Sequence, residues 1–232
     1  MSPVTHRDSM DFFLVKARAR VLQETTYDGW LKVSKSFENE LKRHPAGYSL
    51  VATQYGLSVA YAKMNQKDKA LTAIRAAKAA SKENSVILDK HLAELTYQVA
   101  KTQAQKDQAL ALAKSTCNQY PYSGLAASNY VELLFQSGKH QELVNYLRNQ
   151  SALSRSNPDY HMYLARSYEA LGKKSMAFAA TGDMYALLDN PRAAVYQFEL
   201  AQKANDGDFY IMSEIDAKLR EQRQKVLDQK KD

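Results

Sequence analysis

The sequence predicts an all-α fold, an α-solenoid in which about twelve antiparallel helices stack into a right-handed superhelix. Three observations support this prediction. Apolar residues recur at steps of three and four, which places them on one face of a helix. A Gly or Asn separates successive apolar stripes, and the whole arrangement repeats along the chain. The few Gly and Pro residues, eight and five, lie mostly where helices are expected to end.

The stretch 157–191 shows the repeating pattern most clearly. Tyr160, Leu164 and Tyr168 form the apolar stripe of a first helix. Gly172 then ends that helix, because Gly readily adopts the left-handed conformation found after a helix C-terminus. A second helix follows at once, with Ala177 where the two helices must pass closely. An aromatic residue before a Gly turn and a small residue after it are typical of the tetratricopeptide repeat, whose period is about 34 residues.

Further copies of this pattern occupy much of the chain. One turns at Asn65, since Asn is the next-best residue type for a left-handed turn, and another turns at Gly138. The copy over 91–121 has lost its Gly near Ala104, and the copy over 180–204 is compressed, because it reuses the second helix of the preceding copy as its first. We therefore expect helices near 47–63, 67–81, 85–101, 106–119, 123–137, 140–150, 159–171, 174–188 and 191–204.

Two more helices are predicted before the repeats, within 5–44. Asp8 or Ser9 can cap the first of them. Its expected inward residues are Phe12 or Phe13, Val15, Ala19 and Leu22. The stripe of the second is Trp30, Val33, Phe37 and Leu41. This second helix ends at His44, because the residue before a proline avoids the helical region.

A final helix is predicted over 208–229, with Asp208 at its N-terminus. Its first half is apolar and should cover the C-terminal edge of the solenoid, whereas its polar second half should fray or project. The predicted organisation is one continuous solenoid domain. It consists of an N-terminal capping helix pair at 1–45, tetratricopeptide-like repeats at 46–206, and a C-terminal capping helix with a polar tail at 207–232.

Composition limits the classes of partner. The net charge of +7 comes largely from cations near the chain ends, and no cluster combines aromatic and basic residues as single-strand binding surfaces do, so we expect no nucleic-acid partner. No apolar run approaches the roughly 20 residues that cross a bilayer. The sequence also lacks the cationic start and apolar stretch of a signal peptide. Cys117, the single cysteine, is expected to be a small buried apolar residue.

The sequence offers no catalytic or metal-binding motif. A Gly-rich phosphate loop, a nucleophile elbow and a paired-Cys metal signature are all missing. The histidines are scattered and none forms the His-Glu-x-x-His helix of a zinc protease; they are His6, His44, His91, His140 and His161. We therefore predict that this chain is not an enzyme and carries no catalytic residue, metal ligand or cofactor.

A solenoid of this kind offers a surface for binding instead. The first helix of each repeat lines a groove that can hold a peptide or a helix. The repeat register places these residues in the groove: Tyr55, Lys63, His91, Glu94, Gln98, Glu132, Phe135, Met162, Arg166 and Glu169. Mixed charge together with Phe and Met favours a protein ligand. The alternative is that some of these side chains pack against neighbouring helices.

Two segments resemble a known family. The sequence Asp-Phe-Phe-Leu-Val-Lys-Ala-Arg (Asp11 to Arg18) and the sequence Asp-Phe-Tyr (Asp208 to Tyr210) are the most specific parts of a resemblance that covers nearly the whole chain. The chain is similar to the C-terminal tetratricopeptide domain of periplasmic zinc metalloproteases related to the β-barrel assembly-enhancing protease of Gram-negative bacteria. The middle repeats are generic and add little to this resemblance.

The resemblance implies a context for the chain. In that family the zinc site and the catalytic Glu lie in a domain N-terminal to this one, so no catalytic residue transfers to this sequence. The chain would then be a fragment, as the Met1-Ser2-Pro3 start suggests, from a periplasmic protein. Its expected partners are its own N-terminal protease domain and outer-membrane protein substrates or the β-barrel assembly machinery, and its expected role is recruitment in outer-membrane protein quality control.

The alternative to this role is a free-standing tetratricopeptide scaffold or co-chaperone. Such proteins bind acidic C-terminal peptides of chaperones through cationic groove residues. Lys63 and Arg166 are the candidates here, although several repeats separate them in the sequence.

Overall fold

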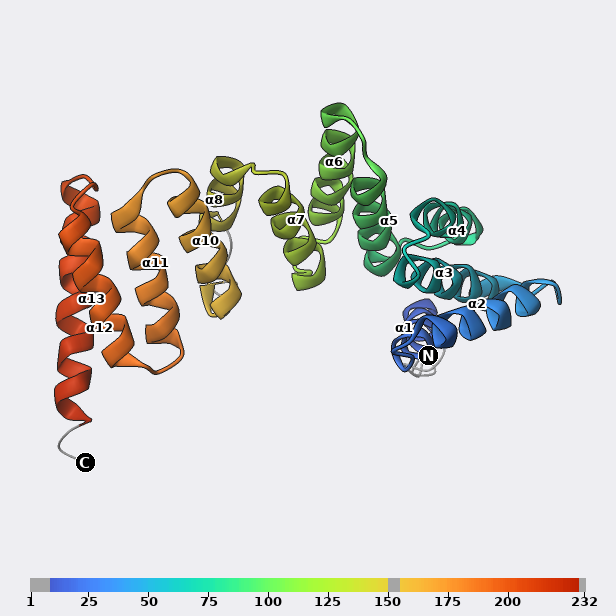
Figure 1. Cartoon of the computed structure of the whole chain (residues 1–232), viewed down its shortest axis with the longest axis horizontal. Coiled ribbons are helices and arrows are strands. Elements are labelled where there is room, and N and C mark those ends of the chain that lie inside the picture. Colours follow the sequence, from blue (N-terminus) through green and yellow to red (C-terminus); the bar gives the residue numbers. More distant parts are fainter. Residues whose placement is uncertain (1–8, 150–154, 230–232) are drawn as a thin grey trace, which may run out of the picture. The chain divides into compact units, whose positions relative to one another are not determined.

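The computed structural model describes residues 9–149 and 155–229. All regular secondary structure in these residues is α-helical, which confirms the predicted fold class (Figure 1). The chain divides into two compact units, Met1–Leu133 and Leu134–Asp232. Each unit is described by itself.

The first unit contains helices α1 to α6 and most of α7. Their bounds are α1 (Met10–Leu22), α2 (Tyr27–Leu41), α3 (Gly47–Lys63), α4 (Lys67–Ala80), α5 (Val86–Val99), α6 (Gln103–Gln119) and α7 (Gly124–Gln136). Helix α3 packs against α4, and α5 packs against α6, as the two helices of a repeat should. The predicted ranges of these helices hold to within a few residues.

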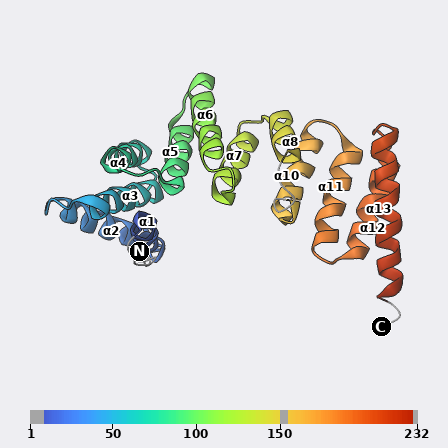
Figure 2. The same cartoon turned by 180° about the vertical axis from the view of Figure 1, so that it is seen from behind.

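The second unit contains the remaining described helices. Their bounds are α8 (His140–Arg148), α10 (Pro158–Ala170), α11 (Lys174–Leu187), α12 (Pro191–Ala204) and α13 (Phe209–Asp228). Helix α11 packs against both α10 and α12, and α12 packs against α13 (Figures 1 and 2). The double use of α11 agrees with the compressed repeat that the sequence predicts.

The three predicted turn residues all have the left-handed conformation. The φ angles of Asn65, Gly138 and Gly172 are +59°, +70° and +73°. At each turn the following amide donates to a carbonyl near the end of the preceding helix. These bonds run from Gln66 N to Tyr61 O, Lys139 N to Leu134 O and Lys173 N to Tyr168 O, at 2.8, 3.0 and 2.9 Å. The shared bond explains why a Gly or Asn recurs at this position of the repeat.

The turn without a Gly, between α5 and α6, is built differently. Ala100 is extended, with φ −64° and ψ 126°. Thr102 then caps α6, and the side chain of Gln105 accepts from the Thr102 amide to complete a capping box. A capped start of α6 therefore replaces the left-handed end of α5 at this junction.

Helix α1 buries a different face from the one predicted. Its inward residues are Met10, Leu14, Ala17 and Val21. The predicted residues Phe12, Val15 and Leu22 are instead 40%, 55% and 46% exposed, and Ala19 is exposed as well. Phe13, the predicted alternative to Phe12, is half-buried and packs against the core. Both stripes have helical spacing, so the sequence pattern alone did not identify the buried one. Ser9 caps this helix as expected, accepting from the amide of Phe12, whereas Asp8 lies outside the described residues.

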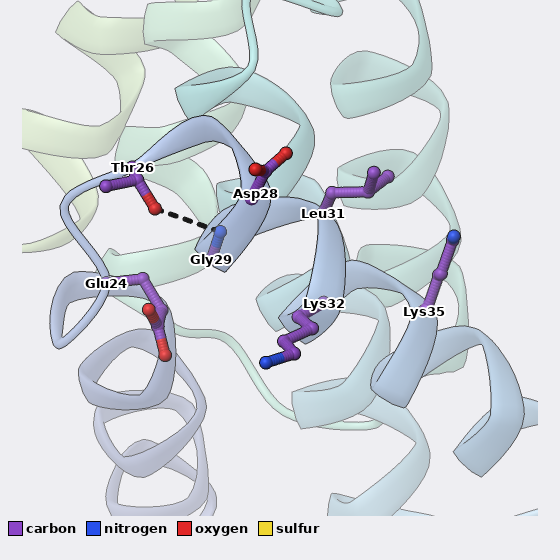
Figure 3. A pocket seen from close by; sticks show the side chains of 7 residues that line it. All are labelled: Glu24, Thr26, Asp28, Gly29, Leu31, Lys32 and Lys35. Atoms are coloured by element: carbon purple, nitrogen blue, oxygen red, sulfur yellow. Dashed lines mark hydrogen bonds between the residues drawn. The ribbon is translucent and has the colours of Figure 1, made fainter.

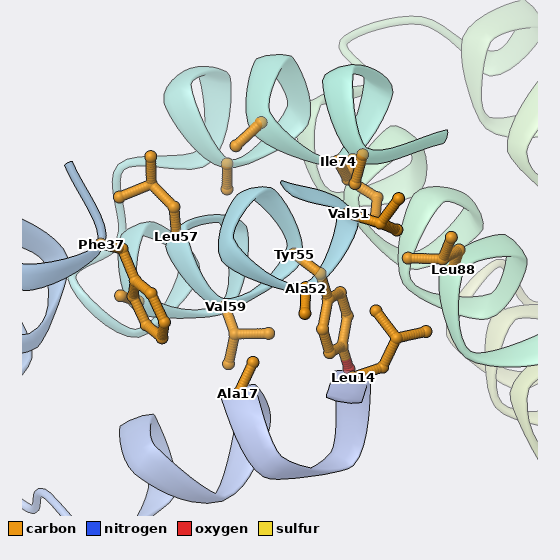
Figure 4. Packing of buried hydrophobic residues seen from close by; sticks show 14 of the residues in the cluster. Leu14, Ala17, Phe37, Val51, Ala52, Tyr55, Leu57, Val59, Ile74 and Leu88 are labelled. Carbon is orange, nitrogen blue, oxygen red and sulfur yellow. The ribbon is translucent and has the colours of Figure 1, made fainter. Parts of the chain in front are cut away.

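The core of the first unit forms where α1 and α2 both pack on α3 (Figure 4). Phe37 of α2 is buried and Trp30, Val33 and Leu41 pack against the core, which confirms the stripe predicted for α2. Gly56 of α3 lies directly under the ring of Phe37. Glycine is needed at this position, because a Cβ there would overlap the ring. Cys117 of α6 is buried as expected.

The C-terminal helix has nearly the predicted bounds, Phe209–Asp228. Asp208 caps α13 by accepting from the amide of Ile211, and Ile215 and Leu219 pack against Phe198 of α12. The helix continues to Asp228, so the expectation that its second half frays is wrong. Buried Gln222 lies in that half, and an ion pair of 2.8 Å joins Arg223 to Glu199 of α12.

Candidate functional site

Five of the predicted groove residues lie on α3 and α5 in the first unit, and we call the surface that they mark the groove face. Lys63 and Gln98 are exposed, and Glu94 is half-buried. Tyr55 and His91 are only 1% and 7% exposed. The expectation that these two side chains line an open groove is therefore corrected. The binding role of the other three remains a prediction.

Helix α1 is the reason that Tyr55 is buried. Leu14 and Ala17 of α1 belong to the same core cluster as Ala52, Tyr55 and Val59 of α3 (Figure 4). These three residues of α3 share one face, at steps of three and four. The Nη1 atom of Arg18 donates to Tyr55 Oη at 3.4 Å. Helix α1 thus lies on the groove face of the first repeat. The sequence did not identify Arg18 as part of this site.

Contacts of Tyr55 with His91, and of His91 with Ser58, lead from the groove face into the interior. The rings of Tyr55 and His91 meet edge to face, with centroids 5.4 Å apart. Ser58 Oγ donates to Ala70 O at 2.7 Å and lies 3.0 Å from His91 Nε2. Because the hydroxyl proton of Ser58 is already used, we assign the donor hydrogen to Nε2 of a neutral His91.

The charges around His91 agree with this assignment. Burial lowers the pKa of His91, with smaller contributions from Arg18 and Lys90, although the carboxylate of Glu94 acts in the opposite direction. For Glu94 itself, burial acts to raise the pKa, but His91 and Lys90 together hold that pKa below its ordinary value. An ionised Glu94 therefore lies at the edge of the groove face, and its Oε2 atom is 3.8 Å from His91 Nδ1.

The second unit brings together two of the predicted groove residues. The guanidinium of Arg166 lies 4.6 Å from the centroid of the Phe135 ring. The rings of Tyr163 and His140 each form a T-shaped contact with the Phe135 ring, at centroid distances of 5.6 and 5.5 Å. Arg166 is exposed and forms no ion pair within residues 9–149 and 155–229. We call Phe135, His140, Tyr163 and Arg166 the aromatic–arginine cluster.

The remaining predicted groove residues lie on α10 and α7. Met162 is half-buried and Glu169 is exposed on α10. Glu132 is half-buried on α7 in the first unit. The sequence analysis did not identify Tyr163 and His140 as site residues. Tyr163 could have been identified, because it is an aromatic residue directly after Met162, which the repeat register places in the groove.

Two hollows lie elsewhere in the first unit. One, of about 370 Å³, is at the start of α2 (Figure 3). Its lining residues are Glu24, Thr26, Asp28, Gly29, Leu31, Lys32 and Lys35. Thr26 Oγ1 accepts from Gly29 N at 3.1 Å, so this polar group serves as a helix cap. A second hollow, of about 440 Å³, is lined by Arg75, Leu92, Thr96, Gln108, Ala111 and Leu112.

The described residues contain neither a cluster of metal ligands nor a membrane-spanning helix. Within 9–149 and 155–229, no three His, Cys, Asp or Glu side chains gather closely enough to hold a metal ion. No described helix is both long and apolar enough to span a bilayer.

Comparison with known proteins identifies the fold. No family model matches the sequence, and no curated protein matches it either. Among solved structures, PilW, a widely conserved type IV pilus biogenesis factor, is similar over 94% of this chain and 98% of its own, with 16% identity and a TM-score of 0.59. A D159K mutant of MamA is similar over 78% and 93%, with 16% identity and a TM-score of 0.55.

A tetratricopeptide repeat protein from Parabacteroides merdae ATCC 43184 is similar over a still larger part of this chain. The similarity covers 96% of this chain and 87% of the other, with 12% identity and a TM-score of 0.53. At these identities the likeness concerns the fold alone. Together with the helix pairs and the left-handed turns, it establishes a tetratricopeptide-type helical repeat.

Proposed function

We propose that this chain is a protein–protein interaction module that holds a carboxylate-bearing segment of its partner at the aromatic–arginine cluster. The observation that carries this proposal is the position of Arg166. Its guanidinium lies over the face of Phe135, is exposed, and has no carboxylate partner among the described residues. Arginine held in this way presents several fixed N–H donors, which suit a carboxylate in two-bond geometry.

The surroundings of Arg166 fit a peptide better than a small ion. Phe135 and Tyr163 provide apolar surface next to the guanidinium, so a side chain of the ligand can be buried while its carboxylate is paired. Aromatic residues and arginine are the residue types that contribute most to protein interfaces. Glu169 lies on the same helix and is exposed, which gives the surface mixed charge.

The finer proposal is that this module is the recruiting arm of a periplasmic zinc metalloprotease in outer-membrane protein assembly and quality control. The resemblance at Asp11 to Arg18 and at Asp208 to Tyr210 supports it. On this proposal the zinc and the catalytic Glu belong to an N-terminal protease domain. That domain, together with outer-membrane protein substrates or the β-barrel assembly machinery, supplies the partners.

The binding proposal can be tested with the purified chain and an unfolded outer-membrane β-barrel protein as the probe. We expect saturable binding, measured by fluorescence anisotropy, that falls at least fivefold in the Arg166→Glu variant. Arg192→Glu is the matched control, because Arg192 is an exposed arginine on α12 of the same unit. Equal binding by the two variants would overturn the role of Arg166.

The protease-arm proposal needs a separate measurement. The chain alone should not cleave the probe, but it should bind the zinc protease domain of the family that it resembles, as measured by analytical ultracentrifugation. Cleavage by the chain alone that a chelator abolishes would contradict the assignment as a non-catalytic arm. Absence of binding to the protease domain would contradict the recruiting role.

A free-standing scaffold or co-chaperone is the second candidate, and the exposed guanidinium of Arg166 also favours it. Lys63 and Arg166 belong to different units, so the scaffold proposal relies on Arg166 alone. A peptide that ends in acidic residues with a free C-terminal carboxylate distinguishes the candidates. Tight binding of this peptide, without binding to the protease domain, would support the scaffold.

A further inference from the structure

Helix α1 occupies the face on which the repeat pattern places a partner. In the first repeat, positions that would line a groove are Ala52, Tyr55 and Val59, and all three are buried in one cluster with Leu14 and Ala17 of α1. We infer that α1 is a tethered ligand of the groove face. An amphipathic helix of a partner protein with the same pattern binds this face when α1 leaves it. This inference rests on the proposed function, because it assumes that the chain binds proteins.

The way that α1 packs differs from the pairing of repeat helices. Helix α2 packs on α3 in the manner of a preceding repeat, with Phe37 against Gly56 and with Tyr61 donating to Glu38 at 2.7 Å. Helix α1 also packs on α3, but its contact with α2 is slight. That contact centres on Arg20, which pairs with Glu40 at 2.8 Å and lies over the ring of Phe37. Helix α1 is therefore an added helix on a completed repeat surface.

The contacts of α1 define the chemistry of the helix that this face accepts. Its buried residues are aliphatic or small and lie at i, i+4, i+7 and i+11; they are Met10, Leu14, Ala17 and Val21. Its polar contacts to the repeats include those of Arg18, which donates to Tyr55, and of Asp11, which accepts from Ser85 Oγ at 2.9 Å. Met10 Sδ also accepts from Ser81 Oγ at 3.2 Å. The face thus fits an amphipathic helix with a narrow aliphatic stripe and an arginine beside it, a helix-in-groove mode of recognition.

The tether makes α1 a strong competitor for any partner. Only residues 23–26 connect α1 to α2, and a short connection of this kind raises the local concentration of a ligand to the millimolar range. A partner helix must therefore bind more tightly than α1 does, or α1 must be drawn away. Cutting the tether removes this advantage without removing any contact of α1.

The experiment uses the full chain with a protease recognition sequence inserted between Glu24 and Thr25. The insertion leaves Thr26 free to cap α2 and leaves Glu24 O as the acceptor for Trp30 Nε1. After cleavage, a fluorescent peptide of residues 9–24, which retains Glu24 O, is added in excess. We expect the peptide to replace the cut segment, as followed by anisotropy, while circular dichroism shows that the rest of the chain keeps its helical content.

Variants of the peptide test the proposed mode of binding. Leu14→Ala should weaken the affinity by at least tenfold, since Leu14 is fully buried. Arg18→Ala should weaken it by about two- to tenfold, the range expected for one hydrogen bond. Val15→Ala is the matched control and should leave the affinity within about twofold, because Val15 is exposed.

Two outcomes would overturn the inference. If excess peptide does not replace the cut segment, or if loss of the segment unfolds the first unit, α1 is an integral part of the core. Equal effects of Leu14→Ala and Val15→Ala would also contradict the binding mode. The proposed function is tested separately by the Arg166→Glu substitution, which lies in the second unit. Failed exchange with retained Arg166-dependent binding overturns only this inference, and successful exchange without Arg166-dependent binding overturns only that proposal.

Discussion

Asp206 and Ser175 form reciprocal hydrogen bonds that join the loop after α12 to the first turn of α11. The Asp206 carboxylate accepts from the backbone amides of Ser175 and Lys174, both at 2.7 Å. In return, Ser175 Oγ accepts from the Asp206 amide at 3.1 Å and donates to Ala201 O at 2.9 Å. Lys173, the residue at the N-cap position of α11, has no side chain suited to capping. The loop between α12 and α13 therefore supplies the missing cap for α11.

This arrangement predicts a pH-dependent loss of stability in the Asp206→Ala variant. The amide of Ser175 is the main cause that lowers the pKa of Asp206, and the amide of Lys174 adds to it. A lowered folded-state pKa means that the carboxylate stabilises the fold above the ordinary Asp value of about 3.9, and that this contribution is lost as the pH falls through the folded-state value. We expect a cost of about 1 kcal/mol at pH 7 and a smaller cost at acidic pH, where the carboxyl is protonated but still has acceptor oxygens.

The measurement for Asp206→Ala is urea unfolding followed by circular dichroism at pH 7 and near pH 2.5. Asp206→Asn is the control, because its amide oxygen keeps one acceptor but carries no charge. A cost for Asp206→Ala that is equal at the two pH values would show that the carboxylate charge does not contribute.

Substitution of Gly182 tests the contact between α11 and α12. A Cβ on Gly182 would lie 2.8 Å from two carbons of the Phe198 ring, and Phe198 is buried in the core of this unit. We expect Gly182→Ala to reduce the free energy of unfolding by about 1–3 kcal/mol through overpacking. Gly124→Ala is the matched control, since nothing lies within 4 Å of a Cβ there. A neutral Gly182→Ala would mean that the two helices separate at low cost.

The sequence was sufficient for features set by local conformation. The left-handed turns at Asn65, Gly138 and Gly172 could be predicted because each needs a residue that tolerates the left-handed conformation, Gly or Asn, at one position of the repeat. Asp208 could be recognised as a cap for the same reason. In contrast, the junction at Ala100 lacked a Gly, and the capping-box pattern of Thr102 and Gln105, three residues apart, was the signal for the next helix that the repeat analysis overlooked.

The sequence was insufficient where a helix has two apolar faces and either could pack against the neighbouring helix. Helix α1 carries two apolar stripes, and the position of α3 decides that Leu14 is buried and Val15 is exposed. The same packing buries Tyr55 and His91, which the repeat register assigns to an open groove. Periodicity identifies a face of a helix, but the choice between two apolar faces depends on tertiary contacts. For Arg166 and Phe135 the structure shows that the two side chains are in contact, and their binding role stays a prediction.

Ser58→Ala should destabilise the first unit more than its small volume suggests. Ser58 is fully buried, and its hydroxyl both donates to Ala70 O and lies 3.0 Å from His91 Nε2. The substitution leaves two buried polar groups without this partner, at an expected cost of about 1–3 kcal/mol. Fluorescence of Trp30, the single Trp of the chain, reports on this unit during urea unfolding. Thr72→Ala removes a similar bond to a backbone carbonyl from an exposed site and should be almost neutral, whereas equal costs would contradict a special role for Ser58.

His91 should make the first unit sensitive to mild acid. Burial lowers the pKa of His91 in the folded state, whereas an unfolded His titrates near 6.5. As the pH falls below about 6.5 the unfolded state therefore binds a proton first, and stability declines. We expect the urea midpoint from Trp30 fluorescence to fall between pH 8 and pH 5, and His91→Gln to remove most of this dependence even if it lowers the midpoint at pH 8. A pH dependence that is unchanged in His91→Gln would assign the acid sensitivity to another group and contradict a neutral, buried His91.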